Sequence, residues 1–209
     1  MSFYAISNKE GEKPRKNFEE YASPISNDIE SSMDNYRFSI KTKDDINRFL
    51  KGIQQKKKNY GINFLNLGKN KNTIEFRLAN GTIDLNTWIQ NIVLFSGLVK
   101  TSEDLAKIQL KPEGERTKEE VEKLKSLAKI KNKSIPEEVR LESFLFIAIP
   151  EEKRDIYRNR YKVNMELIRQ DKDLYRFLSN KTTNKPIDFI GKINHLNKED
   201  DGQIVPGLF

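Results

Sequence analysis

Between residues 73 and 99 the spacing of apolar side chains changes from every second residue to the spacing of a helix. Residues 73–78, TIEFRL, alternate polar and apolar side chains, which is typical of a half-buried strand. Asn80-Gly81 follows, and this dipeptide favours a tight turn because both residue types tolerate positive φ. Residues 87–100 are then apolar over more than half of a helix circumference. The segment therefore predicts a strand, a turn and a central core helix in which Trp88 is buried.

A partner strand is expected just upstream of this segment. Residues 60–67, YGINFLNL, alternate imperfectly and precede a turn signal at residues 68–71, so the pattern predicts an antiparallel hairpin over about residues 60–79. Residues 36–40 predict another short strand. Thr42 and Asp45 have the spacing of a capping box at the start of an amphipathic helix that ends near Lys58. These elements favour the α+β class, an antiparallel sheet with packed helices.

After residue 110 the sequence predicts an all-helical region. Thr117 and Glu120 form a capping box, and Pro136 and Pro150 mark two further helix starts. Arginines and acidic residues interleave between residues 151 and 176, which predicts a solvated, ion-paired face. We therefore expect an α+β domain over residues 1–110 and a helical extension over residues 111–209 that ends in a loose tail. Residues 1–13 are polar enough to be frayed.

Composition excludes several classes of protein. The 209 residues include no cysteine and a single histidine, His195, which excludes thiol chemistry and multi-histidine metal sites. There is no stretch of eighteen apolar residues and no signal-peptide pattern at the start, so we expect a cytoplasmic protein without a membrane partner. The net charge of +7 is a mild excess that suits an anionic partner.

The strand at residues 73–78 carries the best candidate site. Because side chains alternate across a strand, Glu75 and Arg77 share one face while Phe76 points to the other. A carboxylate offers hard oxygen ligands for Mg²⁺, and a guanidinium offers a planar fork for phosphate. The alternative is a plain solvated strand face whose charges form cross-strand ion pairs.

The run NTIEFRLANGTIDLNTWIQNIVLF resembles the signature of the amidoligase family, a branch of the carboxylate–amine ligases similar to γ-glutamylcysteine and glutamine synthetases. The matching parts are a strand with Asn63, then Glu75-Phe76-Arg77, then Gly81-Thr82, then an apolar helix. Upstream, Arg15 and the stretch at residues 21–24 resemble a weaker element of the family. The resemblance covers about residues 14–105.

This resemblance implies an ATP- and Mg²⁺-dependent ligase that joins a carboxylate substrate to an amine substrate. It implies Glu75 as a magnesium ligand and Arg77 as the catalytic residue that neutralises phosphate charge. The remaining implied binding residues are Arg15, Asn63, Gly81 and Thr82. The acidic metal-binding strands expected in the first half of such an enzyme are missing from this sequence. We therefore expect the C-terminal portion of an amidoligase, as a truncated product, a split subunit with an upstream-encoded N-terminal half, or a degenerate copy that is inactive alone.

Two alternatives from other classes remain open. Residues 41–58, with Lys56-Lys57-Lys58, suit a non-catalytic protein that contacts nucleic acid. Residues 117–195 suit a helical interaction module. His195 lacks partners at metal-ligand spacing, which favours a surface or packing role.

Overall fold

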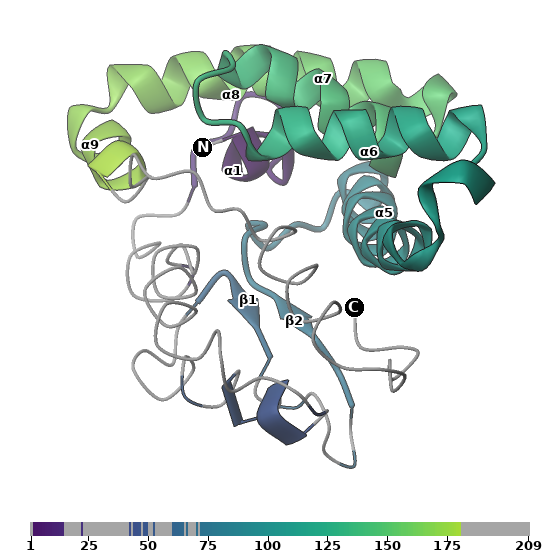
Figure 1. Ribbon diagram of the computed structural model, residues 1–209. Coiled ribbons are helices and arrows are strands. Elements are labelled where there is room, and N and C mark those ends of the chain that lie inside the picture. Colours follow the sequence, from purple (N-terminus) through teal and green to yellow (C-terminus); the bar gives the residue numbers. More distant parts are fainter. Residues whose placement is uncertain are drawn as a thin grey trace. The chain divides into compact units, whose positions relative to one another are not determined.

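The computed structural model describes residues 2–14, 22, 42, 44–46, 48–49, 52, 60–64, 66, 70 and 72–180 (Figure 1). Contacts divide the chain into two compact units, one made by residues 1–14 and 79–176 and one by residues 15–78 and 177–208. Neither unit begins or ends near residue 110. The division into an α+β domain over residues 1–110 and a helical extension over residues 111–209 stays a prediction. The α+β class with a helical C-terminal region is confirmed.

The first unit is helical. It contains α1 (Ser2–Ile6), α5 (Leu85–Leu110), α6 (Lys118–Lys131), α7 (Glu137–Ala148) and α8 (Arg154–Gln170), and α9 (Lys172–Asn180) begins in it. Short 3₁₀ turns, η1 (Glu113–Glu115) and η2 (Glu151–Lys153), precede α6 and α8. Helix α7 packs against α5, α6 and α8, and α1 packs against α8 (Figure 1). Within the part of the chain that the structure describes, every helix is too short or too polar to span a membrane.

Side-chain caps set the start of α6, as predicted, and also the start of α5. The Thr117 hydroxyl accepts from the Glu120 N–H at 3.2 Å, and the Glu120 carboxylate accepts from the Thr117 N–H at 2.8 Å. Asp84 caps α5 by accepting from the N–H groups of Asn86 and Thr87. Each bond satisfies a donor that the first helical turn would otherwise leave without a partner.

Helix α5 is confirmed as a helix, but its orientation differs from the prediction. Its buried face carries Thr87, Asn91, Leu94, Leu105 and Ile108. The large apolar side chains on its other face are exposed, so the prediction that Trp88 lies in the core is wrong: it is 57% exposed, and its exposed neighbours are Leu85, Ile89, Ile92 and Val99. The helix has apolar residues on both faces, and the neighbouring helices cover the face that carries Leu94.

Gly97 allows α5 and α7 to approach closely. A Cβ atom at this position would lie 2.2 Å from the carbonyl oxygen of Ala148 at the end of α7. One turn along α5, the Thr101 hydroxyl donates to the carbonyl of Ile147 at 3.0 Å. The last carbonyl groups of α7 therefore lie directly against the α5 backbone, where a larger residue than glycine does not fit.

The N-terminal segment is anchored, so the prediction of a frayed start is wrong for residues 2–14. The side chains of Tyr4, Ala5 and Ile6 are buried. The Phe3 ring lies 5.6 Å from that of Phe144 and 6.4 Å from that of Phe95, centroid to centroid. These contacts join α1 to α7 and α5, because aromatic pairs at such distances attract each other.

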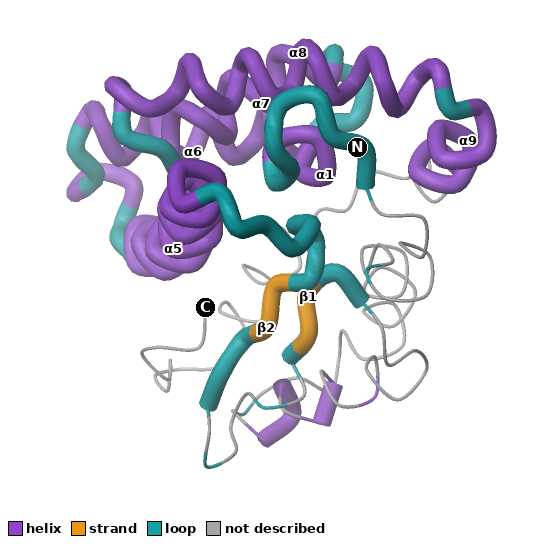
Figure 2. The backbone as a smooth tube through the Cα atoms, turned by 180° about the vertical axis from the view of Figure 1, so that it is seen from behind, coloured by secondary structure: helices purple, strands orange, loops and turns teal. Residues whose placement is uncertain are grey.

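The second unit contains the predicted hairpin. Strands β1 (Ile62–Asn63) and β2 (Glu75–Phe76) pair antiparallel, with Ile62 opposite Phe76 and Asn63 opposite Glu75 (Figure 2). The Arg77 N–H continues the ladder by donating to the Gly61 carbonyl at 2.8 Å. Burial alternates along residues 73–76, and Leu78 is buried. The antiparallel hairpin is confirmed.

Upstream of the hairpin, the capping box of Thr42 and Asp45 is also confirmed. The Asp45 carboxylate accepts from the Thr42 N–H at 2.8 Å, and the described residues between 44 and 52 are helical. The strand predicted at residues 36–40 lies outside the described residues.

We predict that Gly97→Ala lowers the free energy of unfolding by about 1–3 kcal/mol, because the added methyl group must push α5 away from α7. Urea unfolding followed by circular dichroism measures the change. The matched control is Gly81→Ala, whose Cβ would meet no atom within 4 Å. The control should leave stability within about 1 kcal/mol of the wild type. Equal effects of the two substitutions would contradict the close approach at Gly97.

A second prediction concerns alkaline pH. The buried Tyr157 hydroxyl donates to the Gln90 carbonyl at 2.6 Å, and burial raises the pKa of Tyr157 from 10.0 to about 12. The folded state therefore keeps this proton after the unfolded chain has lost it. The resulting stability is fully present below pH 10 and is lost as the pH rises through about 12.

The variant Tyr157→Phe cannot ionise at this position. We expect it to be less stable than the wild type near pH 8, and we expect the difference to shrink between pH 10 and 12. Urea unfolding at a series of pH values measures both proteins. A constant difference across this range would show that the Tyr157 hydroxyl does not remain protonated in the folded state.

Candidate functional site

The hairpin brings Asn63, Glu75 and Arg77 together. The antiparallel register places Asn63 directly opposite Glu75, and alternation places Arg77 on the same face of β2. The Arg77 guanidinium donates two parallel hydrogen bonds to the Glu75 carboxylate, from Nε to Oε1 at 2.7 Å and from Nη2 to Oε2 at 2.8 Å. The buried Asn63 carboxamide donates to the same Oε2 at 3.1 Å. Both carboxylate oxygens are therefore held in a fixed orientation.

The two charged groups stabilise each other's ionised forms. The hydrogen bond from Arg77 lowers the pKa of Glu75, with a further lowering from the positive charge of Arg77 and the Asn63 bond. The hydrogen bond to Glu75 correspondingly raises the pKa of Arg77. The Glu75 side chain is 50% exposed and that of Arg77 is 25% exposed, so water screens the pair. The ion pair lies within one strand, whereas the solvated-face alternative predicted a cross-strand pair.

Gly81 and Thr82 belong to the other compact unit and connect β2 to α5. The Thr82 hydroxyl accepts from the N–H of Asp84 at 3.1 Å, and Asp84 in turn caps α5. Thr82 thus orients the start of that helix. The binding roles predicted for these two residues stay predictions, and Arg15 lies outside the described residues.

The positive-φ turn predicted at Asn80-Gly81 is wrong. Positive φ occurs within the described residues at Asn72 and Gly11, and the Gly81 position has open space around it. The reason is that this dipeptide joins a strand to a helix and does not close a two-residue hairpin. Its conformation is held by hydrogen bonds of Asn80, not by the freedom of glycine.

Three buried polar residues were missed by reasoning from the sequence: Asn8, Arg160 and Asn164. Arg160 was assigned to a solvated face together with its neighbours. That assignment is correct for Arg158, which pairs with Glu142 at 2.8 Å, but Arg160 is only 2% exposed. The sequence contains a signal for this burial, because Arg160 lies at helical spacing from apolar residues of α8. The buried stripe of this helix consists of Tyr157, Arg160, Tyr161, Asn164, Met165 and Ile168.

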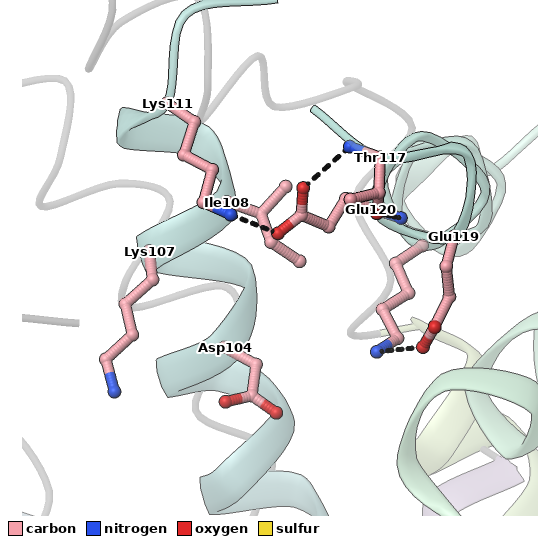
Figure 3. Close-up of a pocket in the computed structure, with 8 residues that line it drawn as sticks. Asp104, Lys107, Ile108, Lys111, Thr117, Glu119 and Glu120 are labelled. Carbon is pink, nitrogen blue, oxygen red and sulfur yellow. Dashed lines mark hydrogen bonds and ion pairs between the residues drawn. The ribbon is translucent and has the colours of Figure 1, made fainter. Parts of the chain in front are cut away.

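A surface hollow of about 280 Å³ lies between the end of α5 and the start of α6 (Figure 3). Its lysines are paired with carboxylates: Lys111 lies 2.5 Å from Glu120, and Lys123 lies 2.7 Å from Glu119. The charges of the lining therefore largely cancel. The hollow contains none of the predicted site residues, and we assign no ligand to it.

Comparison with protein families matched part of the chain to a family model. Residues 17–99 match the family model described as "Putative amidoligase enzyme". The matched range includes Asn63, Glu75, Arg77 and the Gly81-Thr82 dipeptide, and it ends within α5, so α6, α7, α8 and α9 lie outside it. The expected resemblance to amidoligases is thereby confirmed for this part of the chain, while Arg15 lies just before the match. Comparison with curated proteins and with solved structures gave no match.

We predict that the Glu75–Arg77 pair contributes little to folding stability. A half-exposed ion pair has a coupling energy of about 0.2–1 kcal/mol. A double-mutant cycle with Glu75→Gln and Arg77→Gln, followed by urea unfolding, measures this coupling. A coupling energy above about 2 kcal/mol would indicate that the Glu75–Arg77 ion pair serves to stabilise the fold. It would remove the argument that the pair is present for function.

Proposed function

We propose that this chain contributes to an ATP-dependent carboxylate–amine ligase of the amidoligase type. The observation that carries the proposal is the family match, which spans the hairpin on which Asn63, Glu75 and Arg77 meet. The geometry supports it, because an oriented carboxylate and a guanidinium fork are the groups that a metal–nucleotide complex engages.

In a ligase of this class, a carboxylate oxygen of one substrate attacks the terminal phosphorus of ATP. An acyl phosphate forms and ADP leaves. The amine substrate then attacks the acyl carbon, phosphate departs and an amide bond remains. Arg77 would hold the transferring phosphoryl group and offset its negative charge, which is the largest protein contribution to such a transfer.

The donors at the site fit one part of a magnesium site. Mg²⁺ keeps several waters and takes one or two protein carboxylates together with substrate phosphates, so Glu75 suits it as a single ligand. Bound Mg²⁺ would supply charge neutralisation between the phosphates. No cluster of three or more His, Asp or Glu side chains able to hold a metal ion occurs among the described residues. We propose that further acidic ligands come from another segment or from an upstream-encoded partner.

The ion pair adds a condition for ligand binding. Mg²⁺ alone must compete with Arg77 for Glu75, and ATP alone must compete with Glu75 for Arg77, so each ligand alone breaks the ion pair without replacing both of its halves. The complex of Mg²⁺ with ATP replaces both halves of the ion pair at once, because the metal pairs with Glu75 and the phosphates pair with Arg77. Mg²⁺ and ATP together should therefore bind much better than either does alone.

The other two classes of function receive less support. The lysines at residues 56–58, on which nucleic-acid binding depends, lie outside the described residues. The proposed helical interaction module is not separate from the rest, because α6 and α7 pack against α5, and α8 packs against α1.

We predict that Mg²⁺ with ATP raises the melting temperature of the chain, either alone or with its co-expressed upstream partner. The expected stabilisation is about 2.7 kcal/mol at a hundredfold excess over Kd. Mg²⁺ alone and ATP alone should each give a much smaller shift. Arg77→Ala should remove the shift because it deletes the guanidinium that we propose as the phosphate-binding group.

The control variant is Arg158→Ala, which removes an exposed, ion-paired arginine of α8 and should keep the full shift. A lack of any shift both in the isolated chain and in the co-expressed pair would overturn the proposal. An equal loss of the shift in both variants would attribute it to net charge and not to Arg77.

A further inference from the structure

The loop that follows β2 is held by the N-terminal segment. The main-chain N–H of Asn80 donates to the side-chain oxygen of Asn8 at 2.7 Å, and the Asn80 side chain donates to the Lys13 carbonyl at 2.8 Å. Asn80 is therefore fixed in this loop through both its main chain and its side chain. Gly81 and Thr82 follow directly, and the Thr82 hydroxyl orients the start of α5.

Asn8 is itself fixed. It is 1% exposed, and its side-chain nitrogen donates to the Tyr4 carbonyl at 2.8 Å, which points its oxygen at Asn80. Residues 8–14 belong to no helix or strand, so their polar main-chain groups need partners from elsewhere.

Helix α8 supplies these partners through Asn164. Its side-chain nitrogen donates to the carbonyls of Ala5 at 2.8 Å, Lys9 at 3.0 Å and Asn8 at 3.3 Å. Its side-chain oxygen accepts from the N–H of Gly11 at 2.8 Å. Arg160, one turn earlier, donates to the Ile6 carbonyl at 3.2 Å.

We propose that Asn164 and Asn8 are positioning residues that transmit the packing of α8 to the Asn80–Thr82 loop. Helix α8 lies outside the family-matched range, whereas this loop lies inside it. This assigns a role to the helical extension: it holds a motif of the matched segment in place. The consequence for ligand binding rests on the proposed function, and the structural coupling does not.

Amide hydrogen exchange of the full-length chain tests the coupling. Asn8→Ala should speed exchange of the Asn80 amide about tenfold or more, because the acceptor of that amide is lost. Asn8→Asp keeps an acceptor oxygen and should restore exchange to within about threefold of the wild type. The matched control Asn86→Ala removes an exposed asparagine six residues later and should change nothing at Asn80. Unchanged exchange at Asn80 in Asn8→Ala would overturn the proposal.

Asn164→Asp tests the connection to α8, since it keeps the acceptor for Gly11 and loses the three donations. We expect faster exchange at Asn80 as well as at residues 5–9. Faster exchange confined to residues 5–11 would overturn the coupling. The wild type alone gives a second test that needs no variant to fold: the amides of Gly11 and Asn80 should exchange within about tenfold of each other, as members of one cooperative unit. A hundredfold slower exchange at Gly11 would separate them and overturn the proposal.

The consequence for ligand binding is measured as the rise in melting temperature that Mg²⁺ and ATP cause together. Asn8→Ala should weaken the shift and Asn8→Asp should restore it. A full shift in Asn8→Ala, with the Asn80 amide released, would overturn the positioning role while leaving the ligase proposal intact. If the wild type gives no shift, either alone or with its co-expressed upstream partner, the ligase proposal fails, and the exchange data still decide the coupling.

Discussion

The buried carboxamide of Asn164 is the contact on which the helical unit depends most. A segment without regular secondary structure cannot be buried unless its main-chain groups find hydrogen-bond partners. Asn164 offers both donors and an acceptor, and it bonds three such groups, at Asn8, Lys9 and Gly11, and also the Ala5 carbonyl in α1. An apolar residue of similar size would leave these groups unsatisfied, at a cost of about 1–3 kcal/mol each. The polar residue in an otherwise apolar stripe therefore fixes where the N-terminal segment lies.

Arg160 extends the same arrangement toward α5. Its guanidinium donates to the Gln90 side chain and, at 3.2 Å, to the Asn91 side-chain oxygen. Burial lowers the pKa of Arg160, although the ordinary value is high enough for the group to stay charged at neutral pH. Neutral oxygens surround the buried charge, and Asp84, at the start of α5, is among the acidic residues that favour it electrostatically. The polar side chains of α8 thus connect the N-terminal segment with the first turns of α5.

Elements whose signals are local could be predicted from the sequence. The capping boxes at Thr42 and Thr117 involve residues three apart, and the polar–apolar alternation that contains β2 is a property of the consecutive residues 73–78. The same alternation predicted that Glu75 and Arg77 share a face. Long-range contacts could not be predicted, because no local pattern states which distant group will be the partner. The Asn8–Asn80 bond joins residues 72 positions apart, and the contact of Gly97 with Ala148 joins two helices.

The errors at Trp88 and Arg160 have one physical origin. Residue type alone predicts a core position for Trp88 and a solvated position for Arg160. Exposure is set instead by which face the neighbouring helices cover. On α8 the helical period carried more information than residue type, because Arg160 and Asn164 fall on the stripe formed by Tyr157 and Ile168.

Stability does not account for the geometry at Glu75. A solvated strand face needs no particular orientation of its carboxylates, and a half-exposed pair contributes little to folding. Yet the buried side chain of Asn63 is directed at Glu75, and the guanidinium of Arg77 binds both of its oxygens. Two side chains, Asn63 and Arg77, thus orient one carboxylate, and the gain in stability expected from a half-exposed pair is small. An arrangement of that kind is expected where the direction of the carboxylate is itself what matters, as it is for a group that must meet a metal ion and a phosphate at defined positions.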